Sequence, residues 1–131
     1  MSSMLHVDDN EDNILLMRQL LRLRPHIELH VATTGTLGLD AAAEAAPTFI
    51  LLDQHMPDLL GSEVISRLKE SPKTASIPVV LFSADPGLAR EAATWGADGF
   101  LPKPFELKHL LELIDQYCAE SVDESVSRVA E

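Results

Sequence analysis

Short apolar runs alternate with longer amphipathic stretches five times along this chain of 131 residues. Such runs are typical of strands, and their alternation with helical patterns predicts a parallel sheet covered by helices. The expected strands are residues 4–8, 27–32, 48–53, 77–82 and 98–102. The pattern therefore predicts an α/β fold, with a single domain over residues 1–119.

Helices are expected between these strands and after the last one. The first covers roughly residues 11–24 and stops before Pro25, because proline cannot continue a helix. The fourth is expected to start after Asp85, a good N-cap followed by Pro86 at the first helical position. Gly96 is placed to close that helix in a left-handed turn.

Composition is typical of a soluble domain, with 46% hydrophobic and 24% charged residues. No apolar stretch approaches the length needed to span a bilayer, so we expect no membrane contact. The first three residues carry no basic group, which does not support a signal peptide. The lone Cys118 excludes an internal disulfide and fits a reducing compartment, so we expect a cytoplasmic protein with Cys118 in the core. Residues 120–131 are expected to form a short, frayed acidic tail.

The charge balance limits the possible partners. Ten Lys and Arg residues stand against twenty-one Asp and Glu, which gives a formal net charge of −11. Nucleic acids are bound chiefly by basic residues that neutralise phosphates, so we expect no nucleic-acid binding. A strongly negative field favours divalent cations and basic protein surfaces instead.

Chemically active side chains follow the predicted strands. The first strand ends at Asp8 and Asp9, the third at Asp53 and the fourth at Ser83, while Lys103 follows the fifth. The carboxyl ends of parallel strands open on one crevice. We therefore expect three carboxylates, a hydroxyl and an ammonium to converge on one site.

Three converging carboxylates need compensation. Two of them about 4 Å apart repel by roughly 4 kcal/mol at an effective dielectric near 20. A hard divalent cation relieves this repulsion, and oxygen ligands with open water positions suit Mg²⁺. The alternative is that Asp8 or Asp9 serves as the N-cap of the following helix. The independent placement of Asp53 favours the metal.

Four strings in this order and at these separations resemble the receiver domain of two-component response regulators. They are VDDNEDN at 7–13, ILLDQHMPDLLG at 50–61, VVLFSAD at 79–85 and GADGFLPKPF at 96–105. The resemblance covers about residues 4–117. It implies a doubly wound, flavodoxin-like (βα)5 sandwich with strand order 2-1-3-4-5.

That order places strands two and five at the edges, where Glu28, His30 and Pro102 are well suited. His6 is discordant, because it lies in a strand that should be central. We expect it to be a packed, hydrogen-bonded histidine and not a ligand.

The resemblance also implies the roles at the metal site. Asp53 is the phosphoacceptor, whose carboxylate becomes an acyl phosphate. Asp9 and Asp53 supply side-chain ligands to Mg²⁺, Asp8 acts through water, and the main-chain carbonyl of His55 completes the protein's share. Asp58 lies nearby, in a turn where local hydrogen bonding is expected.

A phosphorylation switch is implied as well. Lys103 supplies positive charge to the phosphoryl oxygens, and Pro102 and Pro104 fix its backbone. The Ser83 hydroxyl donates a hydrogen bond to the phosphoryl group, which lets Phe100 swing from exposed to buried. That movement reshapes the face of helix four, strand five and helix five, on which a downstream protein target is expected to bind.

Two further residues, His55 and Asp85, match positions that tune the lifetime of the phosphate in this family. For Asp85 the N-cap role is the competing interpretation. The sequence leaves both roles open.

The first helix holds more apolar residues than one buried face needs. Leu16, Leu20 and Leu23 form a stripe expected to face the sheet. Ile14 and Met17 fall to one side, where exposed apolar area can mark a docking surface. We expect a histidine kinase or phosphotransfer domain to dock there.

The leading interpretation is therefore a phosphoacceptor of a two-component system or phosphorelay, which is no enzyme beyond its own phosphorylation and dephosphorylation. One alternative is a receiver excised from a hybrid histidine kinase or larger regulator. Another is an Mg²⁺-dependent phosphatase with an aspartyl nucleophile, of the haloacid dehalogenase type. Those enzymes carry a second acid two residues after the nucleophile, where this chain has His55.

Overall fold

The computed structural model describes residues 2–118 and contains one sheet of five parallel strands in the order β2-β1-β3-β4-β5. The strands are β1 (Ser2–Val7), β2 (Ile27–Ala32), β3 (Phe49–Asp53), β4 (Val79–Ser83) and β5 (Gly99–Pro102). The helices are α1 (Glu11–Leu20), a short 3₁₀ helix (Leu21–Leu23), α2 (Gly35–Ala45), α3 (Gly61–Glu70), α4 (Leu88–Trp95) and α5 (Leu107–Tyr117). The predicted doubly wound fold and strand order are confirmed.

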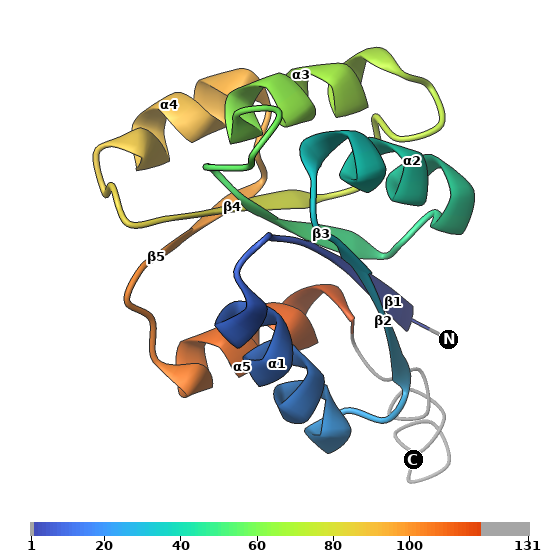
Figure 1. Ribbon diagram of the computed structural model, residues 1–131, viewed down its shortest axis with the longest axis vertical. Helices are drawn as coiled ribbons and strands as arrows, with labels where there is room; N and C mark the ends of the chain where they lie inside the picture. Colours follow the sequence, from blue (N-terminus) through green and yellow to red (C-terminus); the bar gives the residue numbers. More distant parts are fainter. Residues whose placement is uncertain (1, 119–131) are drawn as a thin grey trace, which may run out of the picture.

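The helices form two layers around the sheet. Helices α2, α3 and α4 cover one face, and α1 and α5 cover the other (Figure 1). Side chains alternate between two cores along each strand, so that Leu5 and Val7 face the first layer while Met4 faces the second. The strands β3 and β4 are buried at every position, as strands covered on both faces must be.

Strand β1 pairs with both β2 and β3, so its end lies beside the end of β3. This pairing fixes the place of the carboxylates that follow the two strands. Strands β2 and β5 are the edges, as predicted. Glu28 and Pro102 are exposed there, and His30 is half-buried.

Helix α4 starts later than predicted. It begins at Leu88, and its N-cap is Gly87. The Asp85 carboxylate accepts from the Gly87 N–H at 2.9 Å, and the Leu88 N–H bonds to the Asp85 carbonyl at 3.1 Å. Asp85 therefore closes a turn before the helix, and the predicted N-cap role is wrong. Gly96 ends the helix with φ 104°, as expected.

The predicted faces of α1 are wrong in part. Leu20 is buried as expected, but Leu23 is 60% exposed, and Met17 is 3% exposed and packs in the core with Leu20 and Leu21. Residues 14–17 are all apolar, so the sequence does not show which of them faces the sheet. The chain also tightens into a 3₁₀ turn at Leu21, which changes the direction of the residues that follow. Met17 is thus unavailable for docking, while Ile14 stays half-buried.

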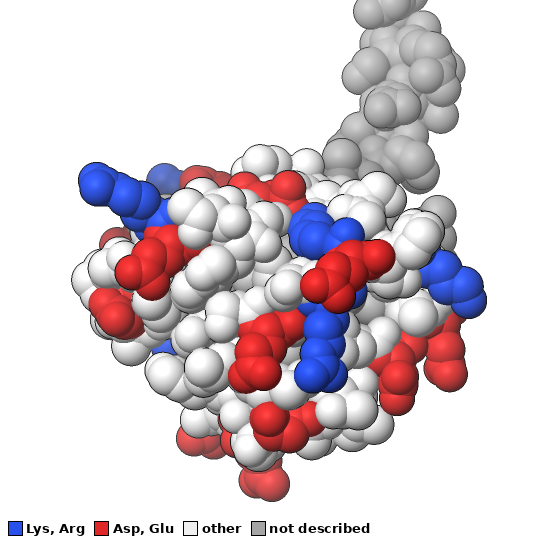
Figure 2. All heavy atoms as spheres, turned by 90° about the horizontal axis from the view of Figure 1, so that it is seen from above, with Lys and Arg blue, Asp and Glu red and all other residues white. Residues whose placement is uncertain are grey.

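Charged side chains are mixed on the face formed by α2, α3 and α4, where acidic and basic groups lie side by side in small groups (Figure 2). Within the described residues, no helix is long and apolar enough to cross a membrane. Cys118 is fully buried, as predicted, and burial raises the pKa of its thiol to about 11. The proposed domain end at residue 119 and the tail 120–131 lie outside the described residues.

Candidate functional site

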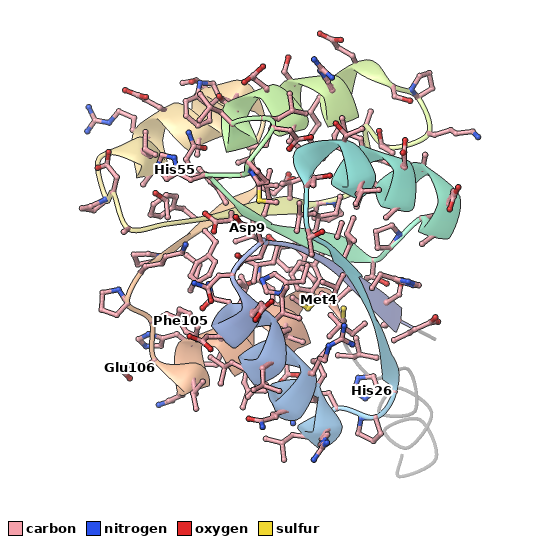
Figure 3. All side chains as sticks on the ribbon, viewed as in Figure 1. Met4, Asp9, His26, His55, Phe105 and Glu106 are labelled. Carbon is pink, nitrogen blue, oxygen red and sulfur yellow. The ribbon has the colours of Figure 1, made fainter. Side chains whose placement is uncertain are left out.

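Three carboxylates converge at the carboxyl end of the sheet. Oxygen atoms of Asp8, Asp9 and Asp53 all lie within 4.8 Å of one another. Asp8 and Asp9 follow β1, Asp53 ends β3, and the pairing of these strands brings them together. At that separation each charged pair repels by at least about 3 kcal/mol at an effective dielectric near 20. Figure 3 places Asp9 and His55 at this same edge.

The Asp8 carboxylate is held by donors from the loop after β1 and from the first turn of α1. Its Oδ1 accepts from the Asn10 N–H at 2.9 Å, and its Oδ2 accepts from the Asn13 side chain at 3.0 Å. The His6 Nε2 lies 3.2 Å from Oδ2. Burial disfavours the charged carboxylate, but His6 and the two asparagine donors outweigh it, so the pKa of Asp8 lies below its usual value.

The Asp53 carboxylate has fewer partners. Its Oδ1 accepts from the His55 N–H at 3.1 Å, and its Oδ2 lies 3.1 Å from the Lys103 ammonium. Asp53 is 5% exposed. Burial raises the pKa of Asp53, the charge of Asp8 adds to this, and the donors from His55 and Lys103 compensate only in part.

Lys103 is held at several points. It follows β5, its N–H donates to the Ser83 carbonyl at 2.8 Å, and its ammonium stands 4.4 Å from the centre of the Phe82 ring. The Lys103–Pro104 peptide bond is cis, which the sequence permits but does not reveal. The predicted meeting of Lys103 with Asp53 is therefore present in the structure.

Ser83 ends β4 and is 2% exposed. Its hydroxyl accepts from the Asp85 N–H at 3.1 Å. Asp85 itself is exposed at the rim. Phe100 is half-buried in β5 and packs against the core under α3 and α4, together with Trp95.

The loop from β3 to α3 carries His55, which is exposed. His55 pairs with Leu60 in an isolated antiparallel bridge, and the Gly61 N–H donates to the Gln54 carbonyl at 2.8 Å. The loop is thereby closed on itself. The main-chain carbonyl of His55 is the group assigned to the metal by the family resemblance.

Sequence reasoning missed two residues near the site, Asn10 and Asn13. Asn10 is the N-cap of α1, so the alternative N-cap role for Asp8 or Asp9 is wrong. Asn10 and Asn13 both contact Asp8, and the spacing of the DDNEDN string could have suggested this. The local role expected for Asp58 is also wrong, because its carboxylate bonds to α2.

His6 was expected to be packed and hydrogen-bonded. It is 1% exposed in central β1. Neither ring nitrogen makes a well-aligned hydrogen bond within the described chain, so its contact with Asp8 is one of proximity and charge. The packing is confirmed, and the expected hydrogen bond is present only as this close, poorly aligned contact of Nε2 with Asp8.

The donor set fits a hard cation. All three side chains offer carboxylate oxygens, and the set includes no sulfur or imidazole ligand, which suits a hard cation such as Mg²⁺ better than Zn²⁺ or Cu²⁺.

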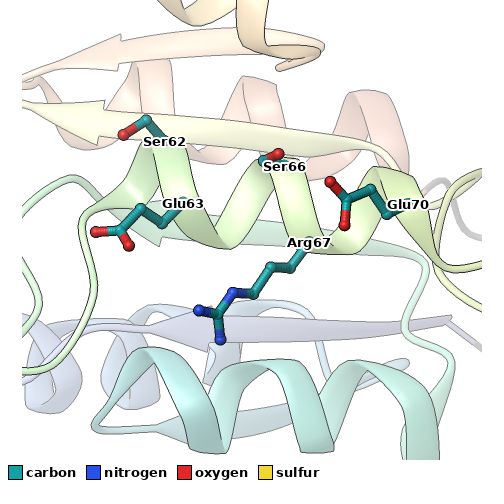
Figure 4. Close-up of a pocket in the computed structure, with 5 residues that line it drawn as sticks. All are labelled: Ser62, Glu63, Ser66, Arg67 and Glu70. Carbon is teal, nitrogen blue, oxygen red and sulfur yellow. The ribbon is translucent and has the colours of Figure 1, made fainter.

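A shallow hollow on the outer side of α3 is separate from this site and shares none of its residues (Figure 4). It is lined by Ser62, Glu63, Ser66, Arg67 and Glu70.

Comparison with known proteins agrees with this geometry. The family of the response regulator receiver domain matches residues 4–115. The chain belongs to this family. Its members take part in two-component signalling, so the expected family and the coarse function are confirmed.

Three similar proteins illustrate the range of relatives. Histidine kinase P4 of Formosa agariphila is 33% identical over 109 residues, which are 82% of this chain but 8% of the kinase. The polar-differentiation response regulator DivK of Brucella ovis is 29% identical over 91% of this chain and 98% of its own length. The receiver domain of the sensor histidine kinase PA1611 from Pseudomonas aeruginosa, solved with Mg²⁺ in its active-site cleft, has a TM-score of 0.79. It is 20% identical, over 91% of this chain and 98% of its own.

The first curated relatives are longer proteins. The chain spans less than half the length of histidine kinase P4, of the Bacillus subtilis regulator YkoG and of the Caulobacter vibrioides regulator PleD. The match therefore does not show that this chain has the activities of those longer proteins.

Proposed function

We propose that this receiver accepts a phosphoryl group on Asp53 from a phosphohistidine of a histidine kinase or phosphotransfer protein. The observation that carries the proposal is the cluster of Asp8, Asp9 and Asp53 with the Lys103 ammonium 3.1 Å from the acceptor carboxylate. An enzyme role toward other substrates is not proposed, because Asp53 itself is the acceptor.

The transfer joins an Asp53 carboxylate oxygen to phosphorus while the bond from phosphorus to the histidine nitrogen breaks. The departing imidazole keeps the bonding electron pair and takes a proton from water. The Lys103 ammonium neutralises charge on the phosphoryl oxygens, and the His55 N–H holds the second Asp53 oxygen.

Asp9, Asp53 and the main-chain carbonyl of His55 would hold Mg²⁺, with Asp8 acting through water. When bound, Mg²⁺ supplies positive charge that screens the carboxylates and the transferring phosphoryl group. The Mg²⁺ in the cleft of the PA1611 receiver supports this assignment.

Signalling is proposed to run from Ser83 to the face formed by α4, β5 and α5. The buried Ser83 hydroxyl would turn from the Asp85 N–H to the new phosphoryl group, and the half-buried Phe100 would move inward. This is a shift between two populated states, biased by the phosphoryl group. The Ser83→Ala variant should accept phosphate but lose the change in affinity for its downstream protein. Unchanged switching in that variant would refute the mechanism.

Two settings are compatible with the relatives. The match over 98% of DivK supports a single-domain regulator, and the match to 8% of histidine kinase P4 supports a receiver within a larger protein. The size of the intact protein in the source cells, measured with an antibody raised against this domain, decides between the two settings.

The test of the central proposal uses acetyl phosphate as a small donor, followed by intact-mass measurement. We expect a single phosphoryl adduct that is absent in the Asp53→Ala variant and absent when EDTA removes Mg²⁺. Continuous release of phosphate from many small esters would favour the phosphatase alternative. An adduct that persists in Asp53→Ala would refute the assignment of the acceptor.

A further inference from the structure

Asp58 connects the loop after the acceptor to a different helix. Its Oδ1 accepts from the Gly35 N–H at 2.7 Å, and its Oδ2 accepts from the Thr36 N–H at 3.0 Å and the Thr36 hydroxyl at 2.7 Å. These donors precede Asp58 by more than twenty residues and belong to the first turn of α2. The Asp58 carboxylate therefore caps α2 from the loop between β3 and α3.

The rest of the α2 N-terminus shows that this capping is complete. Thr34 is the N-cap, and its side chain accepts from the Leu37 N–H at 3.0 Å. The Gly38 N–H bonds to the Thr34 carbonyl at 2.9 Å. Asp58 thus satisfies the two N–H groups of the first turn that Thr34 leaves over. Its negative charge also lies at the positive end of the α2 dipole.

Packing reinforces the connection at the same point. A Cβ atom added to Gly35 would lie 2.9 Å from the Leu59 Cβ, so only glycine allows α2 to approach the loop this closely. The loop is also closed on itself by the bridge between His55 and Leu60. A displacement of Asp58 would therefore be transmitted to His55.

We propose that Asp58 is a positioning residue, which fastens this loop to α2 and thereby fixes the backbone of His55 at the phosphorylation site. His55 contributes two groups there: its N–H, which bonds to Asp53, and its carbonyl, which is assigned to Mg²⁺. The carbonyl part rests on the proposed function, whereas the N–H part rests on the observed hydrogen bond alone.

A carboxylate suits this position better than its amide. Both oxygens of Asp58 accept, and together they receive three hydrogen bonds. The bonds from the Thr36 hydroxyl and N–H lower the pKa of Asp58 to about 2, so the group is charged at physiological pH. Asparagine offers one acceptor oxygen and would set an NH₂ group against the Gly35 or Thr36 donors.

The test compares Mg²⁺ affinity by calorimetric titration in four variants of the full chain. Asp58→Asn should weaken Mg²⁺ binding by about tenfold, the lower end of the usual effect of groups that orient metal ligands. Thr36→Val removes one donor without changing charge and should weaken binding less. Thr36→Ser restores the hydroxyl and should restore the affinity. The matched control is Asp40→Asn, which removes the same charge from an exposed position on α2 and should have no effect.

Amide hydrogen exchange gives a readout that does not depend on the metal. In Asp58→Asn and Thr36→Val, exchange at the His55 N–H should accelerate relative to exchange at Leu51 in β3, which reports global opening. Equal acceleration at both amides, or none, would overturn the proposal. If Asp58→Asn weakens Mg²⁺ binding no more than Asp40→Asn does, the proposal that Asp58 positions the His55 carbonyl for Mg²⁺ fails.

These readouts separate the two proposals. If the wild-type chain binds no Mg²⁺ and forms no adduct, the proposed function fails, and exchange at His55 still decides the role of Asp58. If the wild-type chain forms the adduct and the Asp58 and Thr36 variants match it in affinity and in exchange at His55, the positioning role fails alone.

Discussion

Asp8 and Asp53 occupy the same crevice and are both nearly inaccessible to solvent, yet their environments push their pKa values in opposite directions. The end of β1 surrounds Asp8 with donors from the following helical turn. The end of β3 gives Asp53 one backbone N–H and one ammonium. Burial alone therefore does not decide the pKa of a carboxylate. The contact with His6 and the two asparagine donors lower the pKa of Asp8, whereas the charge of Asp8 adds to burial in raising the pKa of Asp53.

This difference separates two tasks. Asp8 is a satisfied anchor, and its charge contributes to the field of the crevice. The negative charge of Asp53 is only partly compensated by its two donors, so a cation or a proton at this position is favourable.

The largest expected effect concerns the acceptor itself. Asp53→Asn should abolish the phosphoryl adduct, because the amide is not a nucleophile toward phosphorus. Asp8→Asn should keep the adduct but slow its formation, since a charge, one acceptor oxygen and the proposed water contact are lost while the acceptor carboxylate stays. Intact-mass time courses with acetyl phosphate measure both. If both variants lose the adduct to the same extent, the proposed difference between the roles of Asp8 and Asp53 is wrong.

The second effect is on stability. Asn13→Ala removes a side-chain donor from the Asp8 carboxylate while all three charges of the site stay in place, and we expect the free energy of unfolding to fall by about 1–3 kcal/mol. Urea unfolding without Mg²⁺ measures this, with Asp12→Ala on the exposed side of α1 as the control. An equal loss in the control would contradict the anchoring role of Asp8.

A pH dependence follows from the raised pKa of Asp53. The folded protein binds this proton more tightly than the unfolded chain, whose carboxyl titrates near 3.8. Ionised Asp53 therefore costs stability, and this cost grows as pH rises from the unfolded value through the folded one. Without Mg²⁺, the stability of Asp53→Asn minus that of the wild type should increase with pH over this range. Urea unfolding at a series of pH values measures it, and a difference independent of pH would contradict the raised pKa.

The smallest expected effect is at the rim. His55→Ala and Asp85→Asn change exposed side chains beside the site, and we expect the lifetime of the phosphate to change about tenfold or less, with little change in stability. Decay of the adduct, followed by mass after removal of the donor, measures it. If the phosphate decays at the wild-type rate in both variants, these two residues do not tune its lifetime.

Much of the site follows from the sequence because parallel strands end at one edge. Asp8, Asp9, Asp53 and Lys103 were placed by strand ends alone, and each strand end is marked by an apolar run. The fold and its strand order needed the family resemblance in addition, since alternation alone does not order strands.

The errors have a different origin. Met17 was assigned to the surface because it ends a run of four apolar residues, 14–17, within which periodicity leaves the phase of the buried face undetermined. Asp58 was given a local role because its partners lie in another helix, and no local pattern encodes that contact. The start of α4 was misplaced because the turn closed by Asp85 and the helix that follows favour the same residues.

The central claim is that three carboxylates at the end of β1 and β3 share one Mg²⁺ ion. Calorimetric titration of Mg²⁺ into the wild type and the Asp9→Asn variant tests it most directly. We predict one ion per chain in the wild type and affinity at least about tenfold weaker in the variant, because a ligand and a charge are lost together. Binding of equal strength in the two proteins, or no binding in the wild type, would contradict the account.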